Sequence, residues 1–219
     1  SSSSAASDVY KRQLTSLVDG QLEGFDALIA TGSNNAARYF DYYFSKYPHI
    51  IRKNKNGIAV LDGNETQKEL EGLGKDILQY YGLGCRNVSK LYLPKGFDLN
   101  LIFGGLYPYA NVIEMNKYAN NYDYNKAIYL MSDFDFLENG FFILRKDKAI
   151  SSPIATCHYE FYDTLDILKN HLKEQKENIQ CIVSKTDIEG SIAFGQAQYP
   201  QLWDYADGVD TLKFIQSLK

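Results

Sequence analysis

Strand-like and helix-like segments alternate along most of this 219-residue chain, and this alternation restricts its fold more than any other feature. Short apolar runs are followed by longer segments in which apolar residues recur at helical spacing. The expected strands are residues 25–31, 58–61, 88–93, 126–131, 141–144, 154–162 and 181–183, and the expected helices are 36–47, 66–81 and 164–176. The pattern predicts an α/β fold with a parallel or mixed sheet covered on both faces.

The middle of the chain follows this pattern less clearly. Residues 99–115 are apolar and contain glycine, and residues 118–125 are a run of tyrosine, asparagine and aspartate. We expect 118–125 to be a loop, either solvated or lining a ligand channel.

Composition excludes several classes of protein. A hydrophobic fraction of 45% with 23% charged residues is ordinary for a globular protein. The net charge of −4 comes from interspersed signs, so no basic surface for nucleic acid is expected. The longest apolar runs, such as 141–144, are far shorter than the roughly 20 residues of a membrane span. The three cysteines suggest neither a disulfide framework nor a metal site, and a cytoplasmic location is expected.

The first residues are set apart from the rest. Residues 1–13 begin with a low-complexity run of serine and alanine that lacks the hydrophobic stretch of a secretory signal. We interpret 1–13 as a non-native or disordered leader.

One cysteine has the setting of a nucleophile. Cys85 ends a Gly-Leu-Gly-Cys hinge, residues 82–85, between an expected helix and an expected strand. Such a loop presents a thiol, and the pattern indicates a thioester enzyme. Cys157 and Cys181 lie in apolar strand-like runs, where cysteine is usually a small buried hydrophobe.

Four stretches together carry a resemblance to a known family. They are Thr31–Phe40, His49–Asn54, Gly82–Lys90 and Trp203–Asp210. From about Phe25 to its end the chain resembles the aldehyde dehydrogenase superfamily. Within it, the chain is most similar to the acyl-CoA reductase branch, which includes the fatty-acid reductase component of bacterial luminescence.

The resemblance implies a domain organisation. Residues 14–51 are expected to be the tail of a Rossmann-like cofactor domain, and 52–190 a three-layer αβα catalytic domain. Residues 191–219 would pack on the cofactor domain or at an oligomer interface. Because a cofactor domain precedes this segment in the family, we expect the chain to be truncated at its amino terminus.

The resemblance also implies a reaction. The Cys85 thiolate would attack a long-chain fatty acyl-CoA, CoA would leave, and hydride from NADPH would reduce the acyl-enzyme to the aldehyde. Thr31, Gly32, Ser33 and Asn34 match the turn that approaches the dinucleotide at a helix amino terminus.

Residues beside Cys85 are expected to support it. The Cys85 backbone N–H would donate to the oxyanion, Gly84 would let the backbone approach the carbonyl, and Asn87 would assist. Arg86 would lower the pKa of the thiol, or would instead form a surface or interdomain ion pair.

Two departures from the superfamily bear on the reaction. Aldehyde-oxidising members place a water-activating glutamate in the segment that corresponds to 49–56, but no acidic residue occurs between Asp41 and Asp62. Its absence favours reduction over oxidation. The glutamate that binds the nicotinamide ribose would fall near 149–153, and no acid is there either.

The histidines and aspartates complete the candidates. His49 is the candidate acid or base, with a helix cap or a backbone hydrogen bond as its alternative role. His158 and His171 are expected to be structural. The aspartates at 204, 207 and 210 match no calcium loop, and no metal is predicted.

Other readings of the chain stay open. Besides acyl-CoA, a homo-oligomer or an acyl-transferring enzyme is an expected partner. The alternative functions are a cofactor-independent thiol acyltransferase or thioesterase, and an inactive fragment in which Cys85 is structural.

Overall fold

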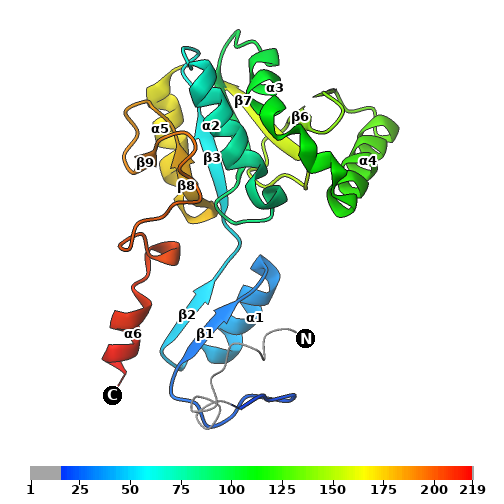
Figure 1. Cartoon of the computed structure of the whole chain (residues 1–219). Coiled ribbons are helices and arrows are strands. Elements are labelled where there is room, and N and C mark those ends of the chain that lie inside the picture. Colours follow the sequence, from blue (N-terminus) through cyan, green and yellow to red (C-terminus); the bar gives the residue numbers. More distant parts are fainter. Residues whose placement is uncertain (1–15, 219) are drawn as a thin grey trace. The chain divides into compact units, whose positions relative to one another are not determined.

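The computed structural model describes residues 16–218, which divide into two compact units (Figure 1). The first unit holds residues 16–52 together with 211–218, and the second holds residues 53–210. The interpretation of residues 1–13 as a leader lies outside the described residues. Each unit is built from strands and helices that follow one another along the chain.

The first unit pairs two parallel strands beside a helix. Its elements are β1 (Leu28–Thr31), α1 (Asn34–Phe44), β2 (His49–Arg52) and α6 (Thr211–Ser217). A Cβ on Gly32 would lie 2.8 Å from the Cβ of Ala36, so only glycine lets the strand turn this closely into α1. Ser33 caps α1 by accepting a hydrogen bond from the backbone N–H of Ala36 at 3.2 Å.

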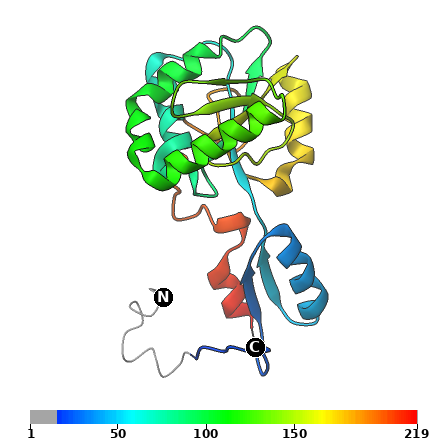
Figure 2. The same ribbon diagram turned by 90° about the vertical axis from the view of Figure 1, so that its right-hand side faces the viewer.

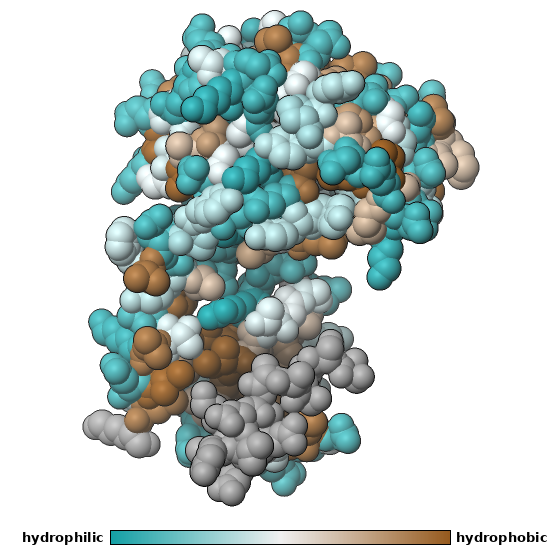
Figure 3. Space-filling model, viewed as in Figure 1, coloured by the Kyte–Doolittle hydropathy of each residue, from teal (hydrophilic) through white to brown (hydrophobic). Residues whose placement is uncertain are grey.

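This unit has a small core. Among its described residues the buried hydrophobic side chains are Ala30, Ala37 and Ile50. Large apolar side chains remain at its surface, including Leu17 and Leu212. Figure 3 shows hydrophobic surface in brown on the lower part of the molecule. The strand at 49–52 was not predicted, because a four-residue run with a histidine and an arginine carries no clear period.

The second unit is a mixed sheet with interleaved helices. Its elements are β3 (Asn56–Val60), α2 (Gln67–Leu78), β4 (Val88–Pro94), α3 (Asn100–Leu106), α4 (Asn116–Met131), β5 (Phe136–Glu138), β6 (Ile143–Lys146), β7 (Thr156–Tyr162), α5 (Leu165–Glu174), β8 (Ile179–Val183) and β9 (Ser191–Ile192). The strand order is β5-β6-β7-β4-β3-β8-β9, and all neighbours are parallel except β5 and β6. The predicted α/β class with a mixed sheet is confirmed.

Helices cover both faces of this sheet (Figure 2). Leu73 of α2, Ile102 of α3 and Tyr118 of α4 belong to one core cluster on one face. Leu168 and Leu172 of α5 pack in a second, smaller cluster on the other face. The predicted three-layer αβα arrangement is therefore confirmed.

Helices α2 and α3 meet backbone to backbone. A Cβ on Gly74 would lie 2.5 Å from the carbonyl oxygen of Gly105, and a Cβ on Gly105 would lie 2.4 Å from that of Leu70. No side chain fits at either position without a shift of the main chain. The glycines therefore fix the distance between the two helices.

Helix α4 overturns the prediction of a loop at 118–125 and a strand at 126–131. Its buried residues are Tyr118, Tyr122, Asn125 and Tyr129, which recur at helical spacing. Tyr118 donates a hydrogen bond to the carbonyl oxygen of Phe141 at 3.0 Å, and Asn125 donates one to Ile154 at 2.9 Å. The core face of this helix is polar-aromatic, so hydropathy gave the wrong prediction.

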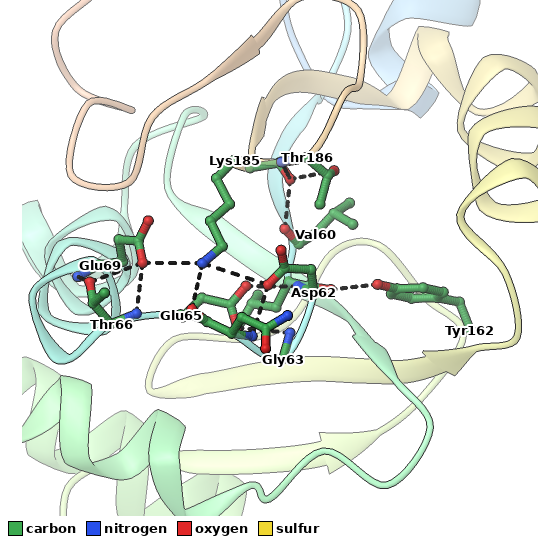
Figure 4. A network of polar contacts seen from close by, with 12 residues as sticks. Val60, Asp62, Gly63, Glu65, Thr66, Glu69, Tyr162, Lys185 and Thr186 are labelled. Carbon is green, nitrogen blue, oxygen red and sulfur yellow. Dashed lines mark hydrogen bonds and ion pairs between the residues drawn. The ribbon is translucent and has the colours of Figure 1, made fainter.

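A charged turn joins β3 to α2 at the carboxyl end of the strand (Figure 4). The Glu65 carboxylate accepts from the backbone N–H groups of Asp62 and Gly63 at 2.7 and 3.1 Å. Thr66 and Glu69 form a capping box that starts α2. Lys185, which follows β8, donates to the Asn64 carbonyl at 2.6 Å and contacts Glu69 at 3.3 Å.

The carboxylates of this turn bind groups of the protein itself. They accept hydrogen bonds from backbone N–H groups and pair with one lysine. These contacts stabilise the loop. No group of three or more histidine, cysteine, aspartate or glutamate side chains suited to a metal occurs within residues 16–218.

Candidate functional site

Cys85 lies in the loop between α2 and β4, at the amino end of the central strands. Its side chain is exposed. Within residues 16–218 its thiol has no hydrogen-bond partner. By contrast Cys157 is fully buried, and burial raises the pKa of its thiol far above the usual range. Of the three cysteines, Cys85 is the one whose thiol faces solvent, as the sequence indicated.

The chain reaches Cys85 through a left-handed turn. Tyr80, Tyr81 and Gly82 have φ angles of 55°, 59° and 73°, and the Leu83 N–H donates to the Tyr80 carbonyl at 3.2 Å. Two consecutive tyrosines in this region are unusual, because a Cβ is crowded there. Such strain persists only where surrounding contacts hold it.

Asn87 supplies those contacts. Its side chain is buried, and its amide nitrogen donates to three carbonyl oxygens at the end of α2, those of Asp76 at 2.9 Å, Ile77 at 3.1 Å and Gln79 at 2.9 Å. Its amide oxygen accepts from the Gly84 N–H at 2.8 Å. One side chain thus satisfies the helix end and pins the residue before Cys85.

These contacts change the predicted role of Asn87. The sequence placed it among the groups that support the oxyanion or the thiol. The structure gives both ends of its amide to the backbone and turns it away from solvent. Any support of Cys85 by Asn87 therefore acts through the shape of the loop.

Glycines allow the loop to pack this tightly. A Cβ on Gly84 would lie 2.8 Å from the Asn87 amide oxygen. A Cβ on Gly57 of β3 would lie 2.6 Å from the Arg86 carbonyl oxygen, and the Gly57 N–H donates to the Asn87 carbonyl at 3.1 Å. Gly84 was predicted as a close-approach position, whereas Gly57 was not identified from the sequence.

The Arg86 side chain lies against residues near Ala197. Its Nε donates to the carbonyl oxygen of Ala197. Burial raises the pKa of the Asp76 carboxyl to about 6, while Arg86 is among the groups that pull it down. Burial likewise raises the pKa of Cys181 to about 11, and Arg86 again opposes the rise. The Arg86 guanidinium thus interacts electrostatically with the Asp76 carboxyl and the Cys181 thiol.

A small cavity lies beside the same loop. It has a volume of about 40 Å³ and lies between Tyr81 and Gly84 on one side and Thr156 of β7 on the other. The Thr156 hydroxyl is buried and has no partner in the described part of the chain. A cavity of this volume holds a water molecule rather than an acyl chain.

The remaining predicted site residues lie in the first unit. Thr31 ends β1, Gly32 and Ser33 form the turn, and Asn34 begins α1. His49 begins β2, and its Nδ1 lies 2.8 Å from the Tyr47 carbonyl oxygen. A carbonyl oxygen only accepts, so Nδ1–H is the donor in this hydrogen bond.

Comparison with solved structures finds a shared fold at low sequence identity. Staphylococcus aureus AldH in its substrate-bound state matches with a TM-score of 0.56 and 13% identity over 89% of this chain and 44% of that chain. An indole-3-acetaldehyde dehydrogenase complexed with NAD⁺ gives 0.54 and 12%, over 75% and 41%. A Mycobacterium tuberculosis aldehyde dehydrogenase complexed with NAD⁺ gives 0.53 and 11%, over 74% and 41%.

The fold is that of the aldehyde dehydrogenases. This chain spans less than half the length of these three enzymes. The sequence matches no protein-family profile and none of the curated proteins. Within residues 16–218, no helix is both long enough and apolar enough to cross a membrane.

The β1–α1 turn leads directly into the amino terminus of a helix. Gly32 lets the strand pack closely against Ala36 and Phe40 of α1, and the first turn of α1 carries no acidic residue. The exposed N–H groups of a helix start attract phosphate. The turn is therefore compatible with a phosphate-bearing cofactor, since no carboxylate of the first helical turn would repel one.

Sequence reasoning missed Asp76. This carboxylate lies on the apolar face of α2, among the buried residues Leu73 and Ile77. A carboxylate on a buried helix face requires hydrogen-bond partners, and that is the signal that could have found it. Its partners, Gly195 and Ala197, are about 120 residues further along the chain.

Proposed function

We propose that this chain carries the nucleophile of an NADPH-dependent reductase that converts a long-chain fatty acyl-CoA to the aldehyde. The observation that supports this most directly is the exposed, unbonded thiol of Cys85 on a loop held by Asn87 in an aldehyde dehydrogenase fold. The acyl group would be held on this thiol between the two half-reactions.

In the first half-reaction the Cys85 thiolate attacks the thioester carbonyl. The carbonyl oxygen becomes an oxyanion, which the backbone N–H of Cys85, a residue of the turn before β4, would bind. The oxyanion collapses, the C–S bond to CoA breaks, and CoA leaves as a thiolate that takes up a proton. The product is an acyl thioester on Cys85.

The second half-reaction requires a hydride donor. The Thr31–Asn34 turn would hold NADPH, which would supply the hydride that reduces the acyl group. The oxyanion left by hydride addition would take up a proton to give a hemithioacetal, which would return this proton and break its C–S bond, releasing the aldehyde and the Cys85 thiolate. His49, through Nε2, is the proposed group that exchanges the proton.

Two observations favour reduction over hydrolysis. Asp76 is the carboxylate whose electrostatic partners include Arg86 of this loop, and both its oxygens accept backbone N–H bonds. The segment between Asp41 and Asp62 contains no acidic residue. An acyl-enzyme without an activated water persists long enough to meet a hydride donor.

The test is acylation of the 219-residue chain. After incubation with palmitoyl-CoA, intact-mass analysis and peptide mapping should find one palmitoyl group on Cys85. Cys85→Ser should lose the adduct, and Cys181→Ser, the matched control, should keep it. An adduct that persists in Cys85→Ser, or none in the native chain, contradicts the proposal.

The fate of the adduct separates the alternatives. Release of palmitaldehyde on addition of NADPH supports the reductase. Release of palmitate, or transfer to an added thiol, at the same rate with and without NADPH supports the thioesterase or acyltransferase instead.

A further inference from the structure

Asp76 is a buried carboxylate without a role in the chemistry proposed above. It lies in the last turn of α2, nine residues before Cys85, and is 1% exposed. Its two oxygens accept hydrogen bonds from the backbone N–H groups of Gly195 at 2.6 Å and Ala197 at 2.9 Å. Both carboxylate oxygens thus bind one segment, residues 194–198.

The same segment contacts the nucleophile loop on both sides of Cys85. Arg86 donates from Nε to the Ala197 carbonyl oxygen. A Cβ on Gly84 would lie 3.4 Å from the Gln198 amide nitrogen. The residues that flank Cys85 therefore rest on the segment that Asp76 holds.

The segment is seated directly on the helix. A Cβ on Gly72 of α2 would lie 3.0 Å from the backbone nitrogen of Gly195, and Gly195 itself has a φ of 80°. With backbone against backbone, the hydrogen bonds of Asp76 fix where residues 194–198 lie.

We infer that Asp76 is a positioning residue for Cys85. It anchors residues 194–198, and these residues in turn hold Arg86 and the loop that presents the thiol. The inference rests on the proposed role of Cys85 as the nucleophile. Asp76 itself touches neither substrate nor the reacting atoms.

This arrangement makes the thiol sensitive to pH through a group other than itself. The charged and titratable groups that act on Asp76 or feel its charge are Lys75 on its own helix, Arg86, Tyr109 and Cys181. Burial raises the pKa of Asp76 to about 6. Below that pH the carboxyl is neutral, its hydrogen bonds to the two N–H groups lose their charge assistance, and Arg86 loses its anionic neighbour.

Two measurements on the 219-residue chain test the inference, and neither requires catalysis. Amide hydrogen exchange reports the anchoring of Gly195 and Ala197. The reaction of Cys85 with dithiodipyridine, measured from below to above pH 6, reports the presentation of the thiol. Asp76→Asn is compared with Asp62→Asn, since Asp62 also accepts a backbone N–H but lies at the other end of α2.

In Asp76→Asn, the amide nitrogen faces one of the two backbone donors, so at least one bond is lost. Exchange at Gly195 or Ala197 should accelerate about fivefold or more, as the loss of one hydrogen bond predicts. The native chain and Asp62→Asn should show an inflection in Cys85 reactivity near pH 6, which Asp76→Asn should lack. Identical exchange and identical pH profiles in the native chain and Asp76→Asn would overturn the inference.

A second variant covers the case in which Asp76→Asn does not fold. Arg86→Gln keeps Asp76 and its bonds to the segment but removes the guanidinium link to the loop. It should retain slow exchange at Gly195 and lose the inflection near pH 6; a retained inflection overturns the inference. A chain that shows the inflection but forms no palmitoyl adduct refutes the proposed function and leaves the positioning role intact.

Discussion

The two ends of helix α2 satisfy their backbone groups in opposite ways. At the amino end, Thr66 and Glu69 cap the helix, and Lys185 pairs with Asp62 and Glu69 at the surface (Figure 4). At the carboxyl end, the buried amide of Asn87 donates to carbonyl oxygens of the helix, and the nearby buried carboxylate of Asp76 accepts from the Gly195 and Ala197 N–H groups, away from water. Surface charges are screened and replaceable, whereas buried hydrogen bonds are expensive to lose. We therefore expect substitutions near Cys85 to have the larger effects.

Asn87→Ala should have the largest effect. It leaves carbonyls at the end of α2 and the Gly84 N–H without a partner in a buried site, so we expect a loss of about 3–5 kcal/mol in the free energy of unfolding. Urea denaturation followed by circular dichroism measures it. A loss below about 1 kcal/mol would mean that water replaces the amide and that the contrast between the helix ends is wrong.

Gly57→Ala should rank second. The new Cβ would lie 2.6 Å from the Arg86 carbonyl and 2.8 Å from that of Asn87, and backbone atoms cannot rotate away. We expect a loss of about 2–4 kcal/mol in the free energy of unfolding. Gly104→Ala in α3 is the matched control: it meets nothing within 4 Å and should stabilise the helix slightly. Equal effects of the two substitutions would contradict the packing of the loop against β3.

The pH dependence of stability gives the third test. The folded pKa of Asp76 is raised from 3.8 to about 6, so between these values the folded state holds the proton more tightly than the unfolded state. The contribution of this group to stability therefore decreases as pH rises from about 4 to about 6, by about 2–3 kcal/mol. Unfolding free energies of the native chain and Asp76→Asn, taken as a difference at each pH, measure it. If the stability of the native chain relative to Asp76→Asn instead increased with pH, the folded-state pKa of Asp76 would be lowered and not raised.

Lys185→Met should have the smallest effect. The lysine bridges Asp62 and Glu69 at the surface, so its loss should lower the free energy of unfolding by less than about 1 kcal/mol, and added salt should shrink the effect. Thermal unfolding at low and high salt measures both. A loss that exceeds that of Asn87→Ala would invert the comparison.

The parts of this structure that could be predicted are those that local sequence patterns indicate. The alternation of strands and helices predicted an α/β fold with a sheet covered on both faces, and the glycine hinge before Cys85 predicted an exposed thiol. Helix α4 was missed because its core face is made of tyrosine and asparagine. The left-handed pair Tyr80 and Tyr81 carries no sequence signal, since glycine or asparagine is the usual residue there.

Long-range contacts account for the rest of what was missed. The hydrogen bonds of Asp76 to Gly195 and Ala197 join positions that only the finished sheet brings together. The same holds for the contact of Gly57 with Arg86, which depends on the register of β3 against β4. Periodicity reports which face of an element is buried, not which residue of another element will meet it.

The glycines of α2 carry a consequence for the kinds of sequence this architecture tolerates. Gly72 faces the backbone of Gly195, and Gly74 faces that of Gly105, so neither position admits even a methyl group without moving the main chain. Glycine is otherwise a poor helix residue, and a library selected for helical propensity alone would replace both. A complete substitution scan of this helix should therefore lose nearly every variant at these two positions, while its solvent-facing positions accept many residue types.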